Sequence, residues 1–445
     1  LDPRAGRHLA PAGGRHGRGE RRRPHGERPG ARPVPGLQDR RDADGRCLRD
    51  GLRRSGAGAP WLGQLRQHDR DEEDRQLTCG PDHDLEEGQA AVFLPVFENG
   101  TVYVASTDGL LVRFNSTTGK ASGVIDTKHK LSGGVGTGEG LLLVGTFKGE
   151  VLAFDEKSGN RLWKAQVSTE VLSPPHAANG MVVIRTGDGR IFSLEASTGK
   201  RKWIYQGATP SLTVRSFAGV LISHDTVYAG FAGGKLVAIN SSTGSVSWEA
   251  AVARPKGASE LERLADVTSL PVMDEQQVCA VAYQGRVACF EITTGNQIWA
   301  QDVSSNAGLA MDSHYLYVSE NRGALVAYDK KDGTRIWTQS LLDGIRLSPP
   351  LVRDARIVVG DSLGYVNLVR NDNGAIVGRS LTDEGAIVTR PIALPDGFAV
   401  QTLKGGIYAF STETMAAPPP LSGSSAILRS PQSQFLCSLL PFCTP

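Results

Sequence analysis

The sequence predicts an all-β fold, an eight-bladed β-propeller built from four-stranded antiparallel blades. Eight copies of one unit follow each other, from TVYVASTDGLLVRFNSTTGK at 101–120 to GFAVQTLKGGIYAFSTET at 397–414. Four short strands in every forty or so residues are typical of a propeller. The glycines of one turn recur at intervals of 40, 40, 45, 51, 38 and 41 residues, at Gly119, Gly159, Gly199, Gly244, Gly295, Gly333 and Gly374.

Each unit has the same internal order. A β-branched apolar run, a glycine-bearing tight turn and a second alternating strand lead to a polar turn that ends in glycine. Glycine is expected there because a chain reversal at positive φ is cheap only without a Cβ. Five units have a tryptophan four residues later, which we expect to pack against the next blade: Trp163, Trp203, Trp248, Trp299 and Trp337. The first and seventh units have Gly123 and Gly378 instead, which predicts looser contacts.

The eighth unit lacks a sequence for its outer strand. It is followed by MAAPPPLSG, whose three consecutive prolines have no N–H to donate to a sheet. The residues before Gly88 contain no alternating apolar run that could replace the strand. We therefore expect the last blade to be missing or to have a poorly paired outer strand.

The composition divides the chain into three parts. Residues 1–86 are rich in Arg, Gly and Pro and contain no Lys, Ile, Phe, Tyr, Asn or Met, which predicts a disordered arm or a segment translated out of frame. The propeller is expected over 87–415 and an irregular tail over 416–445. No apolar run is long enough for a membrane span, and the N-terminus does not resemble a secretory signal. The net charge of +2 gives no bias towards nucleic acid.

Catalytic and metal-binding signals are weak. The histidines of the repeat region fall in different units without ligand spacing: His129, His176, His224 and His314. The sequence therefore predicts a protein that is not an enzyme, with no cofactor and no metal site. Cys279 and Cys289 flank one hairpin, and they face each other only if its turn is centred on Gln284. A register shift by one residue would place them on opposite faces, so a disulfide and two free thiols both remain open.

Two long intervals point to a binding surface. The 45- and 51-residue intervals carry extra residues in QGATPSLTVRSFAGV and in VARPKGASELERLADVTSLP. Repeat proteins usually place such additions in loops on their binding face, so we expect the two insertions to lie side by side. The first offers Leu212 and Val214 next to Arg215, and the second offers Asp266 after a stretch that could form a helical turn. The alternative is a pair of solvated loops without a partner.

The Asp/Asn-x-x-Thr-Gly-x-x-x-Trp pattern resembles the repeat of pyrroloquinoline-quinone-type propellers, although such a repeat does not imply the quinone. More specifically, PSLTVR, GFAGGKLVAINSSTG and ARPKGASELERLADVTSLPV resemble the BamB family of bacterial outer-membrane β-barrel assembly factors. The resemblance covers about 87–415. It implies a non-catalytic scaffold of the BAM complex at the periplasmic face of the outer membrane, which binds the POTRA domains of BamA and helps to assemble unfolded β-barrel proteins.

The resemblance also implies which residues bind BamA. Leu212, Val214 and Arg215 match contacting residues of the family, and Asp266 matches an acidic residue of the same surface. Thr268 stands where the family often has a second acid. The family begins with a signal and a lipid-modified cysteine, but this N-terminus shows no lipobox-like run that would support a lipid anchor. The alternative function is a quinoprotein-like dehydrogenase or a small-ligand-binding propeller.

Overall fold

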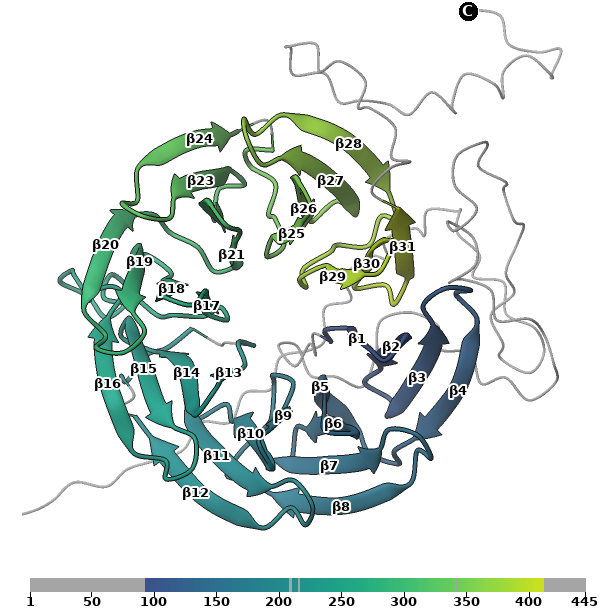
Figure 1. The fold of residues 1–445 in the computed structure, drawn as a ribbon. Helices are drawn as coiled ribbons and strands as arrows, with labels where there is room; N and C mark the ends of the chain where they lie inside the picture. Colours follow the sequence, from purple (N-terminus) through teal and green to yellow (C-terminus); the bar gives the residue numbers. More distant parts are fainter. Residues whose placement is uncertain (1–92, 208–209, 215–216, 341, 412–445) are drawn as a thin grey trace, which may run out of the picture. The chain divides into compact units, whose positions relative to one another are not determined.

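The computed structural model describes residues 93–411, apart from 208–209, 215–216 and 341. The segments 1–86 and 416–445, and the two ends of the predicted 87–415 propeller, lie outside these residues. All regular structure in the described part is β, and it forms eight antiparallel sheets arranged as a ring (Figure 1). No helix in this part has the length and hydropathy of a transmembrane span. The predicted eight-bladed propeller is confirmed.

Seven blades have four strands, in chain order from the middle of the ring to its perimeter (Figure 1). The first two are β1 (Val96–Glu98), β2 (Thr101–Ala105), β3 (Leu110–Asn115), β4 (Ala121–Asp126) and β5 (Leu131–Gly138), β6 (Leu141–Thr146), β7 (Glu150–Asp155), β8 (Arg161–Gln166). The third and fourth are β9 (His176–Ala178), β10 (Met181–Arg185), β11 (Arg190–Glu195), β12 (Arg201–Gln206) and β13 (Leu221–Ser223), β14 (Thr226–Phe231), β15 (Lys235–Asn240), β16 (Val246–Ala251).

The next two blades are β17 (Val272–Met273), β18 (Gln277–Val281), β19 (Arg286–Glu291), β20 (Gln297–Asp302) and β21 (Gly308–Met311), β22 (Tyr315–Ser319), β23 (Leu325–Asp329), β24 (Arg335–Gln339). The seventh is β25 (Leu351–Arg353), β26 (Arg356–Gly360), β27 (Tyr365–Arg370), β28 (Ile376–Leu381). The eighth has three described strands, β29 (Ile392–Leu394), β30 (Gly397–Gln401) and β31 (Ile407–Ser411). The expectation that its outer strand would be lacking is therefore confirmed for the described residues.

Tryptophans from the outer strands link successive blades. Trp248 of β16 donates its indole N–H to the carbonyl of Ile292 in the fifth blade (2.8 Å), and the other four tryptophans make the same bond to the next blade. The turn glycine that packs against the indole ring is required. Gly295 has φ +71°, and a Cβ there would lie 2.6 Å from the Trp248 ring. Arg113 replaces the missing tryptophan of the first blade, because it donates to the equivalent carbonyl of Glu156 (3.1 Å).

The core lies between neighbouring blades. One cluster joins Trp248 of the fourth blade to Val278 and Phe290 of the fifth. Another joins Phe114 of the first blade to Ile407 of the eighth, together with further aliphatic side chains of both blades. Apolar packing therefore connects the first and last blades directly, although β31 has no described strand on its outer side.

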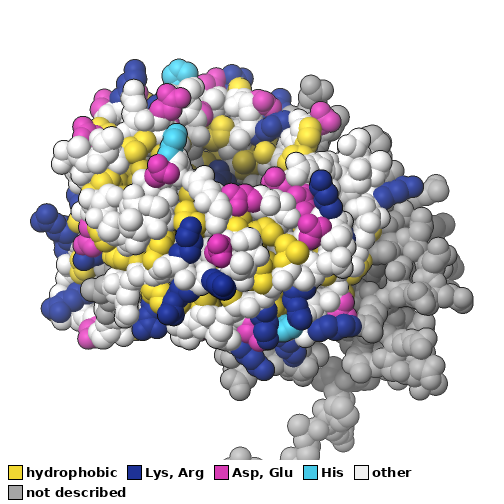
Figure 2. All heavy atoms as spheres, turned by 60° about the horizontal axis from the view of Figure 1, so that its bottom comes forward, with side chains coloured by type: hydrophobic (Ala, Val, Ile, Leu, Met, Phe, Trp, Pro, Cys, Tyr) yellow, Lys and Arg dark blue, Asp and Glu magenta, His cyan; other side chains and the backbone are white. Residues whose placement is uncertain are grey.

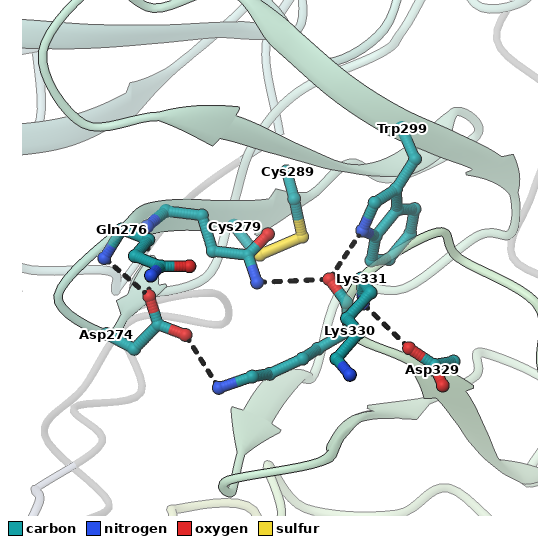
Figure 3. The surroundings of a disulfide bond; sticks show 9 residues. Asp274, Gln276, Cys279, Cys289, Trp299, Asp329, Lys330 and Lys331 are labelled. Atoms are coloured by element: carbon teal, nitrogen blue, oxygen red, sulfur yellow. Dashed lines mark hydrogen bonds and ion pairs between the residues drawn. A yellow bond between two sulfur atoms is a disulfide. The ribbon is translucent and has the colours of Figure 1, made fainter.

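Of the two alternatives for the cysteines, the structure has the disulfide. Cys279 of β18 and Cys289 of β19 are direct cross-strand partners, and their sulfur atoms are bonded (Figure 3). The hairpin is centred on Gln284, whose φ is +49°. Nearby, Lys330 forms an ion pair with Asp274 across two blades (2.8 Å), as Figure 3 also shows. The disulfide thus lies in the fifth blade, close to an ion pair that joins this blade to the sixth.

Candidate functional site

The two insertions lie side by side, as expected. Ser211 in the loop between β12 and β13 donates its hydroxyl to Glu260 in the loop between β16 and β17 (3.0 Å). The second insertion contains a single helix-like turn, in which Arg263 N–H bonds to the carbonyl of Ser259 (3.2 Å). Glu262 caps this turn by accepting the backbone N–H groups of Ala258 and Ser259, and these bonds lower the pKa of its carboxyl.

Asp266 holds the first insertion in place by hydrogen bonds from a buried position. Its carboxylate accepts the N–H of Val214 (2.6 Å) and the N–H of Gly233 in the β14–β15 turn (2.9 Å). Its carbonyl accepts the N–H of Tyr283 from the β18–β19 turn (2.8 Å). The side chain is only 3% exposed. The sequence predicted Asp266 to lie on the partner-binding surface, but the structure buries it, with its carboxylate bonded to two loops and its carbonyl bonded to a third.

The predicted contact residues differ in their exposure to solvent. Leu212 is 39% exposed and Val214 is partly exposed. Arg215 lies outside the described residues. Thr268, which stands where the family often has an acid, is uncharged and buried. Leu261 was not among the predicted contact residues, yet it is 68% exposed in the middle of the second insertion. An apolar residue among the charges of ASELERLADVTS was the signal that could have identified it.

A partly exposed cation, Arg185, lies near Asp266. Arg185 ends strand β10, lies 5.5 Å from the Phe231 ring centroid and donates to the carbonyl of Ala218 (3.5 Å). Burial lowers the pKa of the Arg185 guanidinium to about 10, and the negative charge of Asp266 partly offsets this shift. Both side chains line a small hollow together with Val214. Its volume of about 70 Å³ is well below the roughly 300–1,000 Å³ that small-molecule sites occupy.

The described residues contain no cluster of possible metal ligands. Across 93–411, outside the three short gaps, no group of three or more His, Cys, Asp or Glu side chains could hold an ion. The four histidines belong to different parts of the ring, and burial lowers the pKa of His176. Basic and acidic side chains are interspersed over the face in Figure 2. Such mixed charge gives that face no extended field of one sign.

Comparison with known proteins identifies the family. The family model described as outer membrane protein assembly factor BamB matches residues 121–339 and 293–414. The factor of that name from Nitrosomonas eutropha is 54% identical over 74% of this chain and 80% of its own length, and the one from Bordetella pertussis is 37% identical over 72% and 83%. The crystal structure of BamB from Moraxella catarrhalis matches with a TM-score of 0.68 at 25% identity, covering 72% of this chain and 96% of that one. The chain belongs to the BamB family of outer membrane protein assembly factors.

Proposed function

We propose that this chain is a non-catalytic scaffold subunit of the outer-membrane β-barrel assembly machinery at the periplasmic face of the outer membrane. It binds the POTRA domains of BamA and assists the assembly and insertion of unfolded β-barrel proteins. Its family membership supports the assembly role. The observation that carries the binding site is the Asp266 carboxylate, which fixes two neighbouring insertions into one surface.

The exposed part of this surface has the character of a protein-binding site. Leu212 and Leu261 present aliphatic side chains to solvent on adjacent insertions. Val214, in the same loop as Leu212, lines the small hollow next to Asp266. A few apolar side chains that the partner shields from water contribute most of the binding energy in protein interfaces. Because Asp266 holds the Val214 backbone before binding, little ordering of this loop is required when the partner docks. Arg215 would add a planar donor group beside these anchors.

The binding of the full-length chain to purified BamA POTRA domains tests this proposal. Leu212→Asp places a carboxylate in the contact surface, and we expect it to raise the Kd at least tenfold, or about 1.4 kcal/mol. Leu403→Asp is the matched control, because Leu403 is 58% exposed on the β30–β31 turn of the eighth blade. An unchanged Kd for Leu212→Asp, or equal losses in both variants, would show that the insertions are not the binding surface.

A spectroscopic measurement tests the alternative of a quinoprotein-like enzyme. The full-length chain is incubated with calcium and pyrroloquinoline quinone, and its absorbance is recorded after free quinone has been removed. The scaffold proposal predicts no retained chromophore. Stoichiometric retention of the quinone would contradict it.

A further inference from the structure

A cation at the inner end of the last blade has no partner within the described part of the chain. Arg390 lies two residues before β29 and is partly exposed; its guanidinium makes no hydrogen bond or ion pair within the described residues, and its Nε is shielded from solvent. Thr389 Oγ1 and Gln401 Oε1 are also buried without a hydrogen bond. The β29–β30 pairing ends at Ile392 and Ala399, and Arg390 and Gln401 each lie two residues beyond this last pair.

Arg390 occupies a position that repeats in every blade. By strand register, the other seven blades have glycine, proline or leucine there, as at Leu270, Gly308 and Pro349. A Cβ at Gly308 would lie 3.1 Å from Ser269 and 3.6 Å from Pro349, in the two flanking blades. Gly308, at the start of the innermost strand β21, therefore lies against the segments that lead into the innermost strands of both neighbouring blades. Among the eight, Arg390 alone introduces a charge.

Part of this cation is shielded without a partner. The Nε of Arg390 is out of contact with solvent and makes no hydrogen bond, and this partial burial without a counter-charge lowers the pKa of the guanidinium. A guanidinium nevertheless keeps its proton at neutral pH. Repeat packing does not require arginine at this position, because the equivalent residues are small or apolar. A negatively charged ligand would compensate the cation.

The neighbouring groups indicate the chemistry of that ligand. Arg390 offers a planar fork of N–H donors, Thr389 a hydroxyl and Gln401 an amide N–H. A phosphate group has enough oxygens to accept from all three, and its remaining P–O–H can donate to the unpaired Gln401 Oε1. A carboxylate has two oxygens and no proton at neutral pH. We propose that Thr389, Arg390 and Gln401 form a phosphate-binding site at the inner end of the eighth blade.

Thermal unfolding of the full-length chain tests the site. We expect inorganic phosphate to raise the Tm saturably, whereas chloride at equal ionic strength does not. Arg390→Leu, which introduces the residue found at position 270, should raise the Tm in phosphate-free buffer and abolish the phosphate-dependent rise. Arg201→Gln is the control, because Arg201 is an exposed arginine of β12. It should keep the full phosphate response.

Calorimetric titration gives the second readout. Arg390→Gln preserves polarity and should weaken phosphate binding at least tenfold, as should Thr389→Val to a smaller extent. Glycerol 3-phosphate is titrated separately, because free phosphate and a phosphorylated headgroup share this chemistry, and the tighter binder identifies the source. The proposal is wrong if Arg390→Leu and Arg390→Gln keep the wild-type phosphate response, or if acetate binds as tightly as phosphate.

Discussion

Removal of the Asp266 carboxylate should release the first insertion without unfolding the ring. Asp266→Ala deletes two charge-assisted hydrogen bonds and leaves the N–H groups of Val214 and Gly233 without acceptors. Each such bond contributes about 1.5–3 kcal/mol. The change also removes the negative charge that raises the pKa of nearby Arg185, so this pKa should fall further. We expect the local opening free energy of this loop to fall by about 3–5 kcal/mol.

Amide hydrogen exchange measures this change at the atoms concerned. A loss of about 3–5 kcal/mol accelerates exchange of the Val214 and Gly233 amides by about two to four orders of magnitude. Asp266→Asn keeps one acceptor oxygen and should show roughly half of the loss in free energy. Asp225→Ala, an exposed aspartate in the β13–β14 turn, is the control and should leave both amides unchanged. Wild-type protection of Val214 in Asp266→Ala would refute the role assigned to this carboxylate.

Three further predictions concern the ring itself. Gly295→Ala should destabilise the propeller by at least 1 kcal/mol, because φ is +71° and the new methyl group would overlap the Trp248 ring. Thermal unfolding measures this loss of stability, and an unchanged Tm would contradict the packing described. Replacement of Cys279 and its partner by alanine should cost about 3 kcal/mol by the loop-entropy model, measured by urea unfolding without reductant, and an equal midpoint would contradict it. Amides at 407–410 should exchange faster than those at 236–239, which have strands on both sides; equal protection would show that another strand covers β31.

The periodicity of the sequence was sufficient to predict the architecture. Turn glycines and tryptophans recur because each blade repeats the same contact, in which a ring from one outer strand lies on the turn of the next blade. The same regularity identified the two insertions and predicted that they would touch. The disulfide depended on a register of one residue around Gln284, and sequence alone left that register open.

The energetic roles within the site could not be read from the sequence. An aspartate in a loop is usually solvated, and only the fold shows that Asp266 turns inward to accept two N–H groups from separate segments. Arg185 comes from another blade and ends an ordinary apolar strand, so no local pattern connects it with Asp266. The exposure of Leu261 likewise depends on the path of its loop, which one helix-like turn determines.

Site-specific photo-crosslinking in assembled complexes tests the central claim most directly. A photoreactive amino acid is introduced at Leu212 in one full-length variant and at Leu403 in another, since both side chains are exposed but lie on different blades. The proposed binding surface predicts a covalent adduct with BamA from position 212 and none from position 403. An adduct from position 403 alone, or no adduct from either position while BamA still co-purifies, would contradict the claim that the two insertions bind the POTRA domains.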